Sequence, residues 1–398
     1  MSDLRQVTRS LEPDQPPSTM GRRFSRGLLF QGIIWAIFLL FVEMLLRLFV
    51  PAPSREYHPW FGTHTRGGTS LRYKSGIDDS EFDQVVQYNR EGFHDVEHVM
   101  SKRKGDVRVV ILGDSIVEAR EVALEENFCR VLESQLNHSS SSFPDNRYEL
   151  VNLGVSGAGP LLASLMYRHA GTGKDADLVL MCCFPNDLSD DVRFHDSVER
   201  DRRGWAYRIP TSSGIVPIPL WSKQFLRTQT RTWPYLGSRI QRAVQVIKGQ
   251  ALPISAPDPF QDLLIAARDG QTDHLDEAWK KLMANLENLQ ALVRQRGAGF
   301  GLIAVPLGHQ ILTRPEWETG RKRYGLRRGS GGDFQARLRE FALRKGIPFL
   351  DLRSSFESAQ ATSLFFPYDG HLTTEGHRVA ADAIGGWLLE EKLINVSK

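Results

Sequence analysis

Val109-Val110-Ile111-Leu112-Gly113-Asp114-Ser115 is the stretch that decides the fold, because it places a serine directly after a short, β-branched apolar run. The run 107–112 has the length of one strand and ends at Gly113, which is typical of a buried strand in a parallel sheet. Sheets of this kind bind ligands at the carboxyl ends of their strands. The hydroxyl of Ser115 is therefore predicted to lie where an α/β enzyme holds its nucleophile.

Four further apolar runs repeat this pattern, at 148–153, 178–184, 300–305 and 347–352. Helical patterns separate them, and the clearest is 275–296, where apolar residues recur every three or four positions. Strands that alternate with helices build a parallel sheet covered by helices on both faces. The sequence therefore predicts an α/β fold of three layers, α/β/α, around a five-stranded parallel sheet.

The N-terminal region predicts a transmembrane helix. Residues 27–50 are 24 mainly apolar residues, long enough to cross a bilayer, and they follow a polar tail at 1–26. The charges inside the span, Glu43 and Arg47, lie four apart and can pair on one helix face. A cleaved signal peptide is the alternative, but Val50-Pro51-Ala52-Pro53 is a poor small-x-small cleavage site. We therefore expect an uncleaved anchor that contacts the membrane lipid bilayer.

The flanking charges predict the orientation of this single-pass span. Arg22, Arg23 and Arg26 precede it closely, whereas only Arg55 and Arg66 follow soon after it. Positive residues stay on the cytoplasmic side of a membrane. The N-terminus is therefore predicted to be cytoplasmic, and the remainder of the chain periplasmic or extracellular.

Beyond the span, residues 51–104 are rich in glycine, proline and charge and are predicted to form an irregular lead-in, with one strand and turn at 85–93. Residues 105–398 form the main domain, interrupted by an insertion at about 188–273 that has no plain strand. We expect the insertion to leave the sheet near the active face, where it can cover a substrate. Its aromatic residues fit packing within the insertion better than stacking on sugar rings; they include Trp205, Trp221, Trp233 and Tyr235.

Composition excludes several functional classes. The net charge is only +3 with no basic stripe, so no nucleic-acid partner is expected. Three cysteines, Cys129, Cys182 and Cys183, are too few for a disulfide scaffold and are predicted to be buried small hydrophobic residues. No cysteine and histidine spacing resembles a zinc site, so no structural metal is expected.

A second cluster, Asp369-Gly370-His371, supplies the groups that a serine nucleophile needs. A serine hydroxyl is a poor nucleophile without an adjacent base, usually histidine, which a carboxylate orients. His371 and Asp369 fit these two roles. His377 is the alternative base, but it is predicted to lie in the final helix, which Thr373 or Thr374 caps. Asp114 is predicted to cap or stabilise its turn rather than to take part in catalysis.

Two loops at strand ends could meet the negative charge that develops on a carbonyl oxygen during acyl transfer. The loop 152–157 contains Gly154, whose backbone N–H could approach a substrate closely because glycine has no side chain. The second loop follows the run 178–184 and offers the side-chain amide of Asn186. We expect both groups to face the same edge of the sheet as Ser115.

These blocks, taken in order, resemble the SGNH or GDSL hydrolase family. They are Gly113-Asp114-Ser115, Gly154, Asn186-Asp187, and Asp369 with His371. The resemblance implies a flavodoxin-like fold that needs no cofactor, with Ser115 as nucleophile and His371 as general base. It also implies an oxyanion hole formed by the N–H groups of Ser115 and Gly154 and the amide of Asn186. The lead-in 88–93 before this serine block is similar to that of membrane-anchored bacterial members.

The chain departs from the family pattern at two places. The family usually places the aspartate three residues before the histidine, whereas Asp369 lies two before His371, a variant also found in relatives that act on envelope polysaccharides. The usual third block begins with glycine, which Phe184-Pro185 replaces here. The first departure affects the role expected for Asp369. The second implies a different backbone conformation before Asn186.

Three functional hypotheses follow from these residues. The first is a membrane-anchored serine esterase that forms an acyl-enzyme on Ser115 and acts on an ester-bearing envelope glycan or lipid. The second is an O-acyltransferase of a cell-surface polysaccharide, since a sugar hydroxyl can resolve the same acyl-enzyme as water does. The third is a catalytically silent envelope scaffold that presents its insertion to a partner.

Overall fold

The computed structural model describes residues 19–49, 54–58, 60–75, 81–139, 147–209, 230, 272–311, 332–359, 363–366 and 369–394. Residues 1–52 belong to a different compact unit from the one that holds the described strands.

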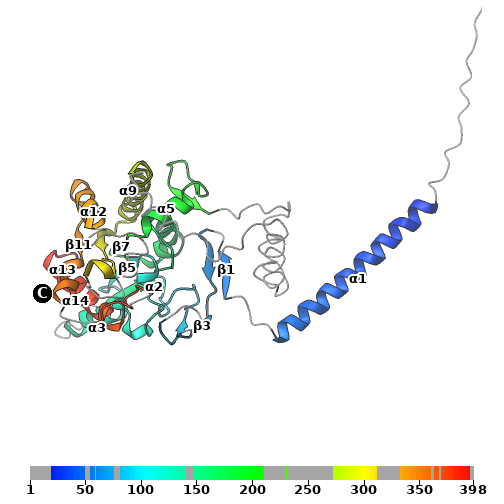
Figure 1. The fold of residues 1–398 in the computed structure, drawn as a ribbon, viewed down its shortest axis with the longest axis horizontal. Helices are drawn as coiled ribbons and strands as arrows, with labels where there is room; N and C mark the ends of the chain where they lie inside the picture. The colour runs from blue at the N-terminus through cyan, green and yellow to red at the C-terminus, as the bar shows by residue number, and fades with distance from the viewer. Residues whose placement is uncertain are drawn as a thin grey trace, which may run out of the picture. The chain divides into compact units, whose positions relative to one another are not determined.

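The first unit contains one long described helix, α1 (Thr19–Phe49), which Figure 1 shows as uninterrupted. Within it, Phe30–Phe49 has a mean hydropathy of 2.2, and 0% of its most apolar window is buried. By length and composition this segment could be a membrane anchor or a signal sequence. The predicted pairing is confirmed, because Arg47 Nε donates a hydrogen bond to Glu43 Oε1 at 2.8 Å.

The second unit is built on the predicted five-stranded parallel sheet, with the strand order β11-β10-β7-β5-β6. All five strand predictions are confirmed to within two residues at either end. The last strand begins later than predicted, at Phe349, because Pro348 has no N–H to donate to a neighbouring strand. The strands are β5 (Val107–Leu112), β6 (Tyr148–Asn152), β7 (Leu178–Cys183), β10 (Gly299–Ala304) and β11 (Phe349–Asp351).

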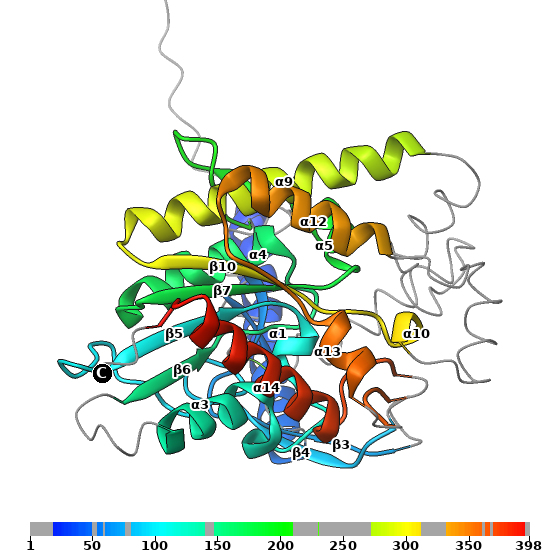
Figure 2. The ribbon, with the colours of Figure 1, turned by 90° about the vertical axis from the view of Figure 1, so that its left-hand side faces the viewer.

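Helices cover both faces of this sheet, as predicted (Figure 2). Successive side chains of β5 alternate between two apolar cores: Val109 and Ile111 lie in one, Val110 and Leu112 in the other. The first core lies under α3 (Phe128–Ser139) and α14 (Thr374–Glu390). The second lies under α4 (Pro160–Met166), α5 (Asp187–His195), α9 (Thr272–Gln295) and α12 (Gly332–Lys345).

Shorter helical segments complete the second unit. They are α2 (Ser115–Glu118), η1 (Leu124–Glu126), η2 (Tyr167–Gly171), η3 (Thr172–Lys174), α10 (Gly308–Ile311) and α13 (Arg353–Ser358).

The prediction for the cysteines is confirmed, since the thiols of Cys129, Cys182 and Cys183 are free and buried.

The lead-in is more regular than the sequence predicts. It forms two antiparallel pairs, β1 (Arg55–His58) with β2 (Gly62–Thr65) and β3 (Ser70–Tyr73) with β4 (Gln84–Gln87). Strands of four residues that are mostly polar give too short a periodicity to detect. The lead-in from Pro53 onward is part of the second unit and contacts its sheet, since Asp95 Oδ2 accepts a hydrogen bond from the N–H of Asn152 in β6 at 2.7 Å.

The insertion begins later than predicted. Residues 187–195 form α5, which packs on α4 and α9, and Asn285 Nδ2 donates to the buried Asp191 Oδ2 at 2.9 Å. A short hairpin of β8 (Glu199–Arg200) and β9 (Ala206–Arg208) follows, and Trp205 packs against the core. Trp221, Trp233 and Tyr235, and with them the predicted covering role, fall outside the described residues.

Candidate active site

Ser115 is the first residue of α2, directly after the carboxyl end of β5, as the sequence predicts. The predicted capping role of Asp114 is confirmed, because its Oδ1 accepts a hydrogen bond from the N–H of Ile116 at 3.0 Å. A side chain at Gly113 would lie 2.4 Å from Val117 Cγ2 and 3.0 Å from the Cys182 carbonyl. The tight turn that exposes the Ser115 hydroxyl therefore requires glycine at this position.

His371 connects Ser115 to Asp369 through its two ring nitrogens. The Nε2 atom lies 2.7 Å from Ser115 Oγ, and the Nδ1 atom is hydrogen-bonded to Asp369 Oδ1. Gly370, at φ +82°, turns the backbone so that the carboxylate faces the ring of its second neighbour. The short spacing between Asp369 and His371 is thus compatible with a serine–histidine–aspartate arrangement.

The charges around His371 favour its protonated form. Burial by itself would lower the pKa of His371, but the negative charges of Glu121 and Asp369 raise it to about 9. For Asp369, burial would raise the pKa, but the hydrogen bond from His371 and its charge lower it overall. The site is therefore built to stabilise an imidazolium, the species that a histidine base forms when it takes a proton.

His377 does not reach Ser115. It lies in α14, fully buried, with its ring stacked on Phe128, and its Nδ1 accepts a hydrogen bond from the Phe128 N–H at 3.4 Å. Burial and the nearby charge of His371 lower the pKa of His377 to about 3. Thr373 caps α14, since its hydroxyl accepts from the N–H of Gly376. The geometry therefore brings His371, and not His377, to the serine.

The prediction for Gly154 as an oxyanion donor is wrong in this conformation. Its N–H donates to Asn152 Oδ1 at 2.8 Å and so is already engaged. The lack of a side chain serves packing instead, because a Cβ there would lie 2.4 Å from the Glu118 nitrogen and 2.6 Å from the Val117 carbonyl carbon. Gly154 thus lets the loop after β6 contact the backbone of α2.

Gly157, in the same loop, is a candidate donor that the sequence reasoning missed. Its φ is +75°, and among the described residues no hydrogen bond from its N–H is found. A Cβ there would lie 3.7 Å from Asp190 Oδ1, and Asn186 Nδ2 donates to Asp190 Oδ2 at 3.1 Å. The loop with Gly157 and the Asn186 amide therefore meet beside Asp190. The positive φ that singles out this glycine is invisible in the sequence.

Glu118 holds this loop against α2. Its Oε2 accepts hydrogen bonds from both the N–H and the hydroxyl of Ser156, and its Oε1 accepts one from the Tyr88 hydroxyl at 2.7 Å. Burial would raise the pKa of Glu118, but these hydrogen bonds lower it overall, so the carboxylate is kept charged. The lead-in, through Tyr88, thereby helps to fix the position of the loop relative to Ser115.

Gly154→Ala is expected to disturb the site through packing. The added methyl group would collide with backbone atoms of Val117 and Glu118, which cannot rotate away as a side chain can. Overpacking of this kind costs about 1–3 kcal/mol, or roughly 2–8 °C in melting temperature for a domain of this size, and we also expect lower esterase activity. Thermal melting with an activity assay measures both.

The matched control is Gly386→Ala in α14, where a Cβ meets nothing within 4 Å. That change should leave the melting temperature unchanged or raise it, because alanine favours a helix. Equal melting temperatures and activities for the two variants would contradict the packing role of Gly154.

Glu121 is a further carboxylate at the site that the sequence reasoning missed. Ligand atoms of Glu121, Asp369 and His371 lie within 4.8 Å of one another, close enough to hold a metal ion. Both ring nitrogens of His371 are already used, by Ser115 and by Asp369. The group is therefore better described as a hydrogen-bonded cluster than as a metal centre.

The sequence matches the model of the GDSL-like lipase/acylhydrolase family over residues 111–379, more than half of the chain. The chain belongs to this family. As a GDSL-family acylhydrolase it is an ester-hydrolysing enzyme, and the flavodoxin-like fold expected from the resemblance is confirmed. No curated protein matches this sequence significantly.

Several solved structures resemble this GDSL-family chain. TesA is 12% identical, with a TM-score of 0.38, over 72% of this chain and 99% of its own. The acetyl xylan esterase AlAXEase is 15% identical, with a TM-score of 0.36, over 70% and 98%. A catalytic mutant of Axe2, an acetylxylan esterase from Geobacillus stearothermophilus, is 12% identical, with a TM-score of 0.37, over 71% and 94%. The family assignment rests on the sequence match alone.

Proposed function

We propose that this enzyme cleaves its ester through an acyl-enzyme on Ser115, with His371 as general base and Asp369 as its partner. The observation that carries the proposal is the 2.7 Å distance between His371 Nε2 and Ser115 Oγ. As Oγ attacks the carbonyl carbon, Nε2 takes the hydroxyl proton and then delivers it to the departing alkoxide. Water, activated by the same nitrogen, releases the acid. A catalytically silent scaffold would not need this arrangement.

The developing negative charge on the carbonyl oxygen needs donors that are already in place. We assign this role to the backbone N–H groups of Ser115 and Gly157 and to the side-chain amide of Asn186. Ser115 supplies the first N–H of α2, and the other two donors meet beside Asp190. Each such donor contributes about 3 kcal/mol to transition-state stabilisation in enzymes of this type.

The proposal places the enzyme at a membrane, with residues 27–50 as an uncleaved anchor. The apolar segment Phe30–Phe49 and the arginines that precede it support this placement. The catalytic unit then lies outside the cytoplasm, in the periplasm or extracellular space. Its substrates are accordingly esters of the cell envelope.

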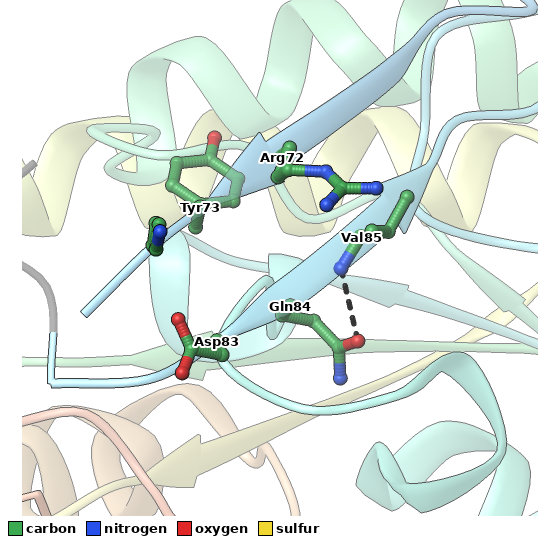
Figure 3. Close-up of a pocket in the computed structure, with 6 residues that line it drawn as sticks. Arg72, Tyr73, Asp83, Gln84 and Val85 are labelled. Atoms are coloured by element: carbon green, nitrogen blue, oxygen red, sulfur yellow. Dashed lines mark hydrogen bonds between the residues drawn. The ribbon is translucent and has the colours of Figure 1, made fainter.

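A cavity of about 390 Å³ supports a polar substrate (Figure 3). It lies at the β3–β4 hairpin, where the ring of Tyr73 has its centre 5.4 Å from the guanidinium of Arg120, the residue next to Glu121. Most lining side chains are charged or polar, which suits sugar hydroxyls better than an acyl tail. We therefore propose an acylated glycan as substrate. The lining residues are Arg72, Tyr73, Lys74, Asp83, Gln84 and Val85.

The full-length protein in detergent is expected to prefer a short acyl group. Acetyl and octanoyl esters of one phenol should differ by about tenfold or more in kcat/KM, in favour of acetyl, because most residues that line the described cavity are charged or polar. An O-acetylated polysaccharide should release acetate. A preference for octanoyl, with no acetate released, would contradict the glycan assignment and indicate a lipid.

The fate of the acetyl group distinguishes hydrolysis from O-acyl transfer. A labelled acetyl donor is incubated with candidate glycans, and the label is followed into free acetate and into the glycan. Label mainly in the glycan would identify an acyltransferase, whereas free acetate identifies an esterase.

A further inference from the structure

A second buried carboxylate faces His371 on the same side as Asp369. Glu121 Oε1 lies 3.5 Å from His371 Nδ1, the nitrogen that is hydrogen-bonded to Asp369. The Glu121 side chain is only 1% exposed, and its Oε2 has no hydrogen-bond partner among the described residues. A carboxylate is costly to bury, so its position next to the imidazole requires an explanation.

The chain reaches this position through a left-handed turn directly after α2. Ala119 has φ +54°, a conformation that side chains rarely adopt, and it is buried. Strained backbone of this kind persists where the surrounding structure holds it, often at functional sites. The turn carries Glu121, six residues after Ser115, back to the histidine that contacts the serine.

Arg120 is the partner that a purely structural role would invoke. Its Nε donates to Glu121 Oε1 at 3.1 Å, with 25% of the Arg120 side chain exposed. An ion pair of neighbouring residues could be made equally well at the surface, without burying the carboxylate. The pairing with Arg120 does not explain why the Glu121 carboxylate lies toward His371 Nδ1.

We propose that Glu121 is a second positioning carboxylate for His371, which shares with Asp369 the stabilisation of the imidazolium. The inference rests on the proposed function, in which His371 takes the proton of Ser115. Since Nδ1 has one hydrogen, Asp369 accepts it in the resting structure and Glu121 acts through its charge at 3.5 Å. If Asp369 is lost, Glu121 is close enough to accept that hydrogen and keep the ring in the productive tautomer.

The protonation of the cluster supports this role. Burial raises the pKa of Glu121 to about 7, against the opposing charges of His371 and Arg120. Glu121 is therefore ionised in the pH range near 9, where His371 loses its proton. Charged and titratable groups face this cluster from the elements packed around it. They are Asp369 and Glu81 around the His371 loop, Asp114 and Arg120 on either side of α2, and His377 in α14.

A double-mutant cycle with the full-length protein and an activated acetate ester tests the sharing. We expect Glu121→Gln to lower kcat about 3- to 10-fold, and Asp369→Asn to lower it about 10- to 100-fold. The double variant should lose about 10⁴-fold, more than the product of the single losses, because no carboxylate then remains for the ring. Losses that simply multiply, or a loss in Asp369→Asn as large as in the double variant, would overturn the proposal.

The pH dependence of kcat/KM gives a readout that a structural role would not move. The neutral imidazole is the active base, so activity rises with pH through the pKa of His371. Removal of the Glu121 charge should move this rise to lower pH by about one unit or more. Glu121→Asp, which keeps the charge, should retain most of the wild-type profile. Glu125→Gln removes an equal charge at an exposed site in η1 and should leave the profile unchanged.

Folding and function are separated by two further controls. If Glu121→Gln does not melt cooperatively, Glu121→Ala is read in the same way, since it removes the carboxyl group without leaving an amide unpaired. An inactive wild-type protein would refute the proposed function. An active wild type whose Glu121 variants keep its pH profile would refute this inference alone.

Discussion

Replacing Ser115 with alanine is expected to lower kcat for ester hydrolysis by about 10⁴-fold or more, because Ser115 carries the hydroxyl that contacts His371 Nε2 and forms the proposed acyl-enzyme. Of the hydrogen bonds described, the Ser115 hydroxyl makes only the one to His371, so its loss should not disturb the fold. The melting temperature should stay within a few degrees of wild type. Steady-state hydrolysis of an activated acetate ester, with thermal melting beside it, measures both quantities.

The chain offers a matched control for this substitution. Ser134 lies on the exposed face of α3, where its hydroxyl is 3.3 Å from His138 Nδ1. Ser134→Ala removes a serine–histidine contact that involves neither Ser115 nor His371 and should leave kcat unchanged. Wild-type turnover in folded Ser115→Ala would contradict the assignment of the nucleophile.

His371→Gln is expected to cause a loss of similar size, on the order of 10⁴-fold in kcat, because Ser115 would lose its base. Glutamine is close to histidine in length but cannot accept and return a proton. The loss should be of kcat in folded protein rather than of stability. The measurement is a stopped activity assay on protein whose folding has been verified by thermal melting.

His377→Gln separates the two histidines of the C-terminal cluster. Because His377 is a buried residue of α14 and accepts a hydrogen bond from the N–H of Phe128, its replacement should lower the melting temperature. Turnover per folded molecule should remain within about tenfold of wild type, since the ring does not reach Ser115. If His377→Gln abolished turnover in folded protein while His371→Gln retained it, the roles of the two would have to be exchanged.

The central sheet and the grouping of Ser115, His371 and Asp369 were predictable because they follow from strand patterns and from the spacing of residues at strand ends. A β-branched run that ends in Gly113 predicts both β5 and the exposure of Ser115, since sheet geometry places a residue after a strand at the carboxyl edge. The pairing of Asp369 with His371 follows from their separation of two residues. Sheet geometry and local chain geometry were sufficient for these predictions.

The proposed oxyanion donor in the loop 152–157 could not be predicted from the sequence. Gly154 and Gly157 lie three residues apart, and their composition gives no reason to prefer either as a donor. The choice depends on which N–H is already bonded, in this case that of Gly154 to Asn152, and on a positive φ at Gly157. Both are properties of the folded backbone.

Glu121 was missed for a different reason. In the run Ala119-Arg120-Glu121, alternating charge after a helix is typical of a solvated surface. Only the left-handed turn at Ala119 directs the carboxylate inward, and a non-glycine residue gives no signal for such a turn. The insertion boundary was misjudged similarly, because α5 is recognised as part of the helical layer only through its packing on α9.

Covalent labelling tests the central claim most directly. The full-length protein is treated with a fluorophosphonate, which reacts with serines that a neighbouring base activates, and the labelled peptide is identified by mass spectrometry. The account predicts one adduct, on Ser115, formed in wild type and in Ser134→Ala but at least about 100-fold more slowly in His371→Gln. An adduct on another serine, or labelling of Ser115 that does not depend on His371, would contradict it.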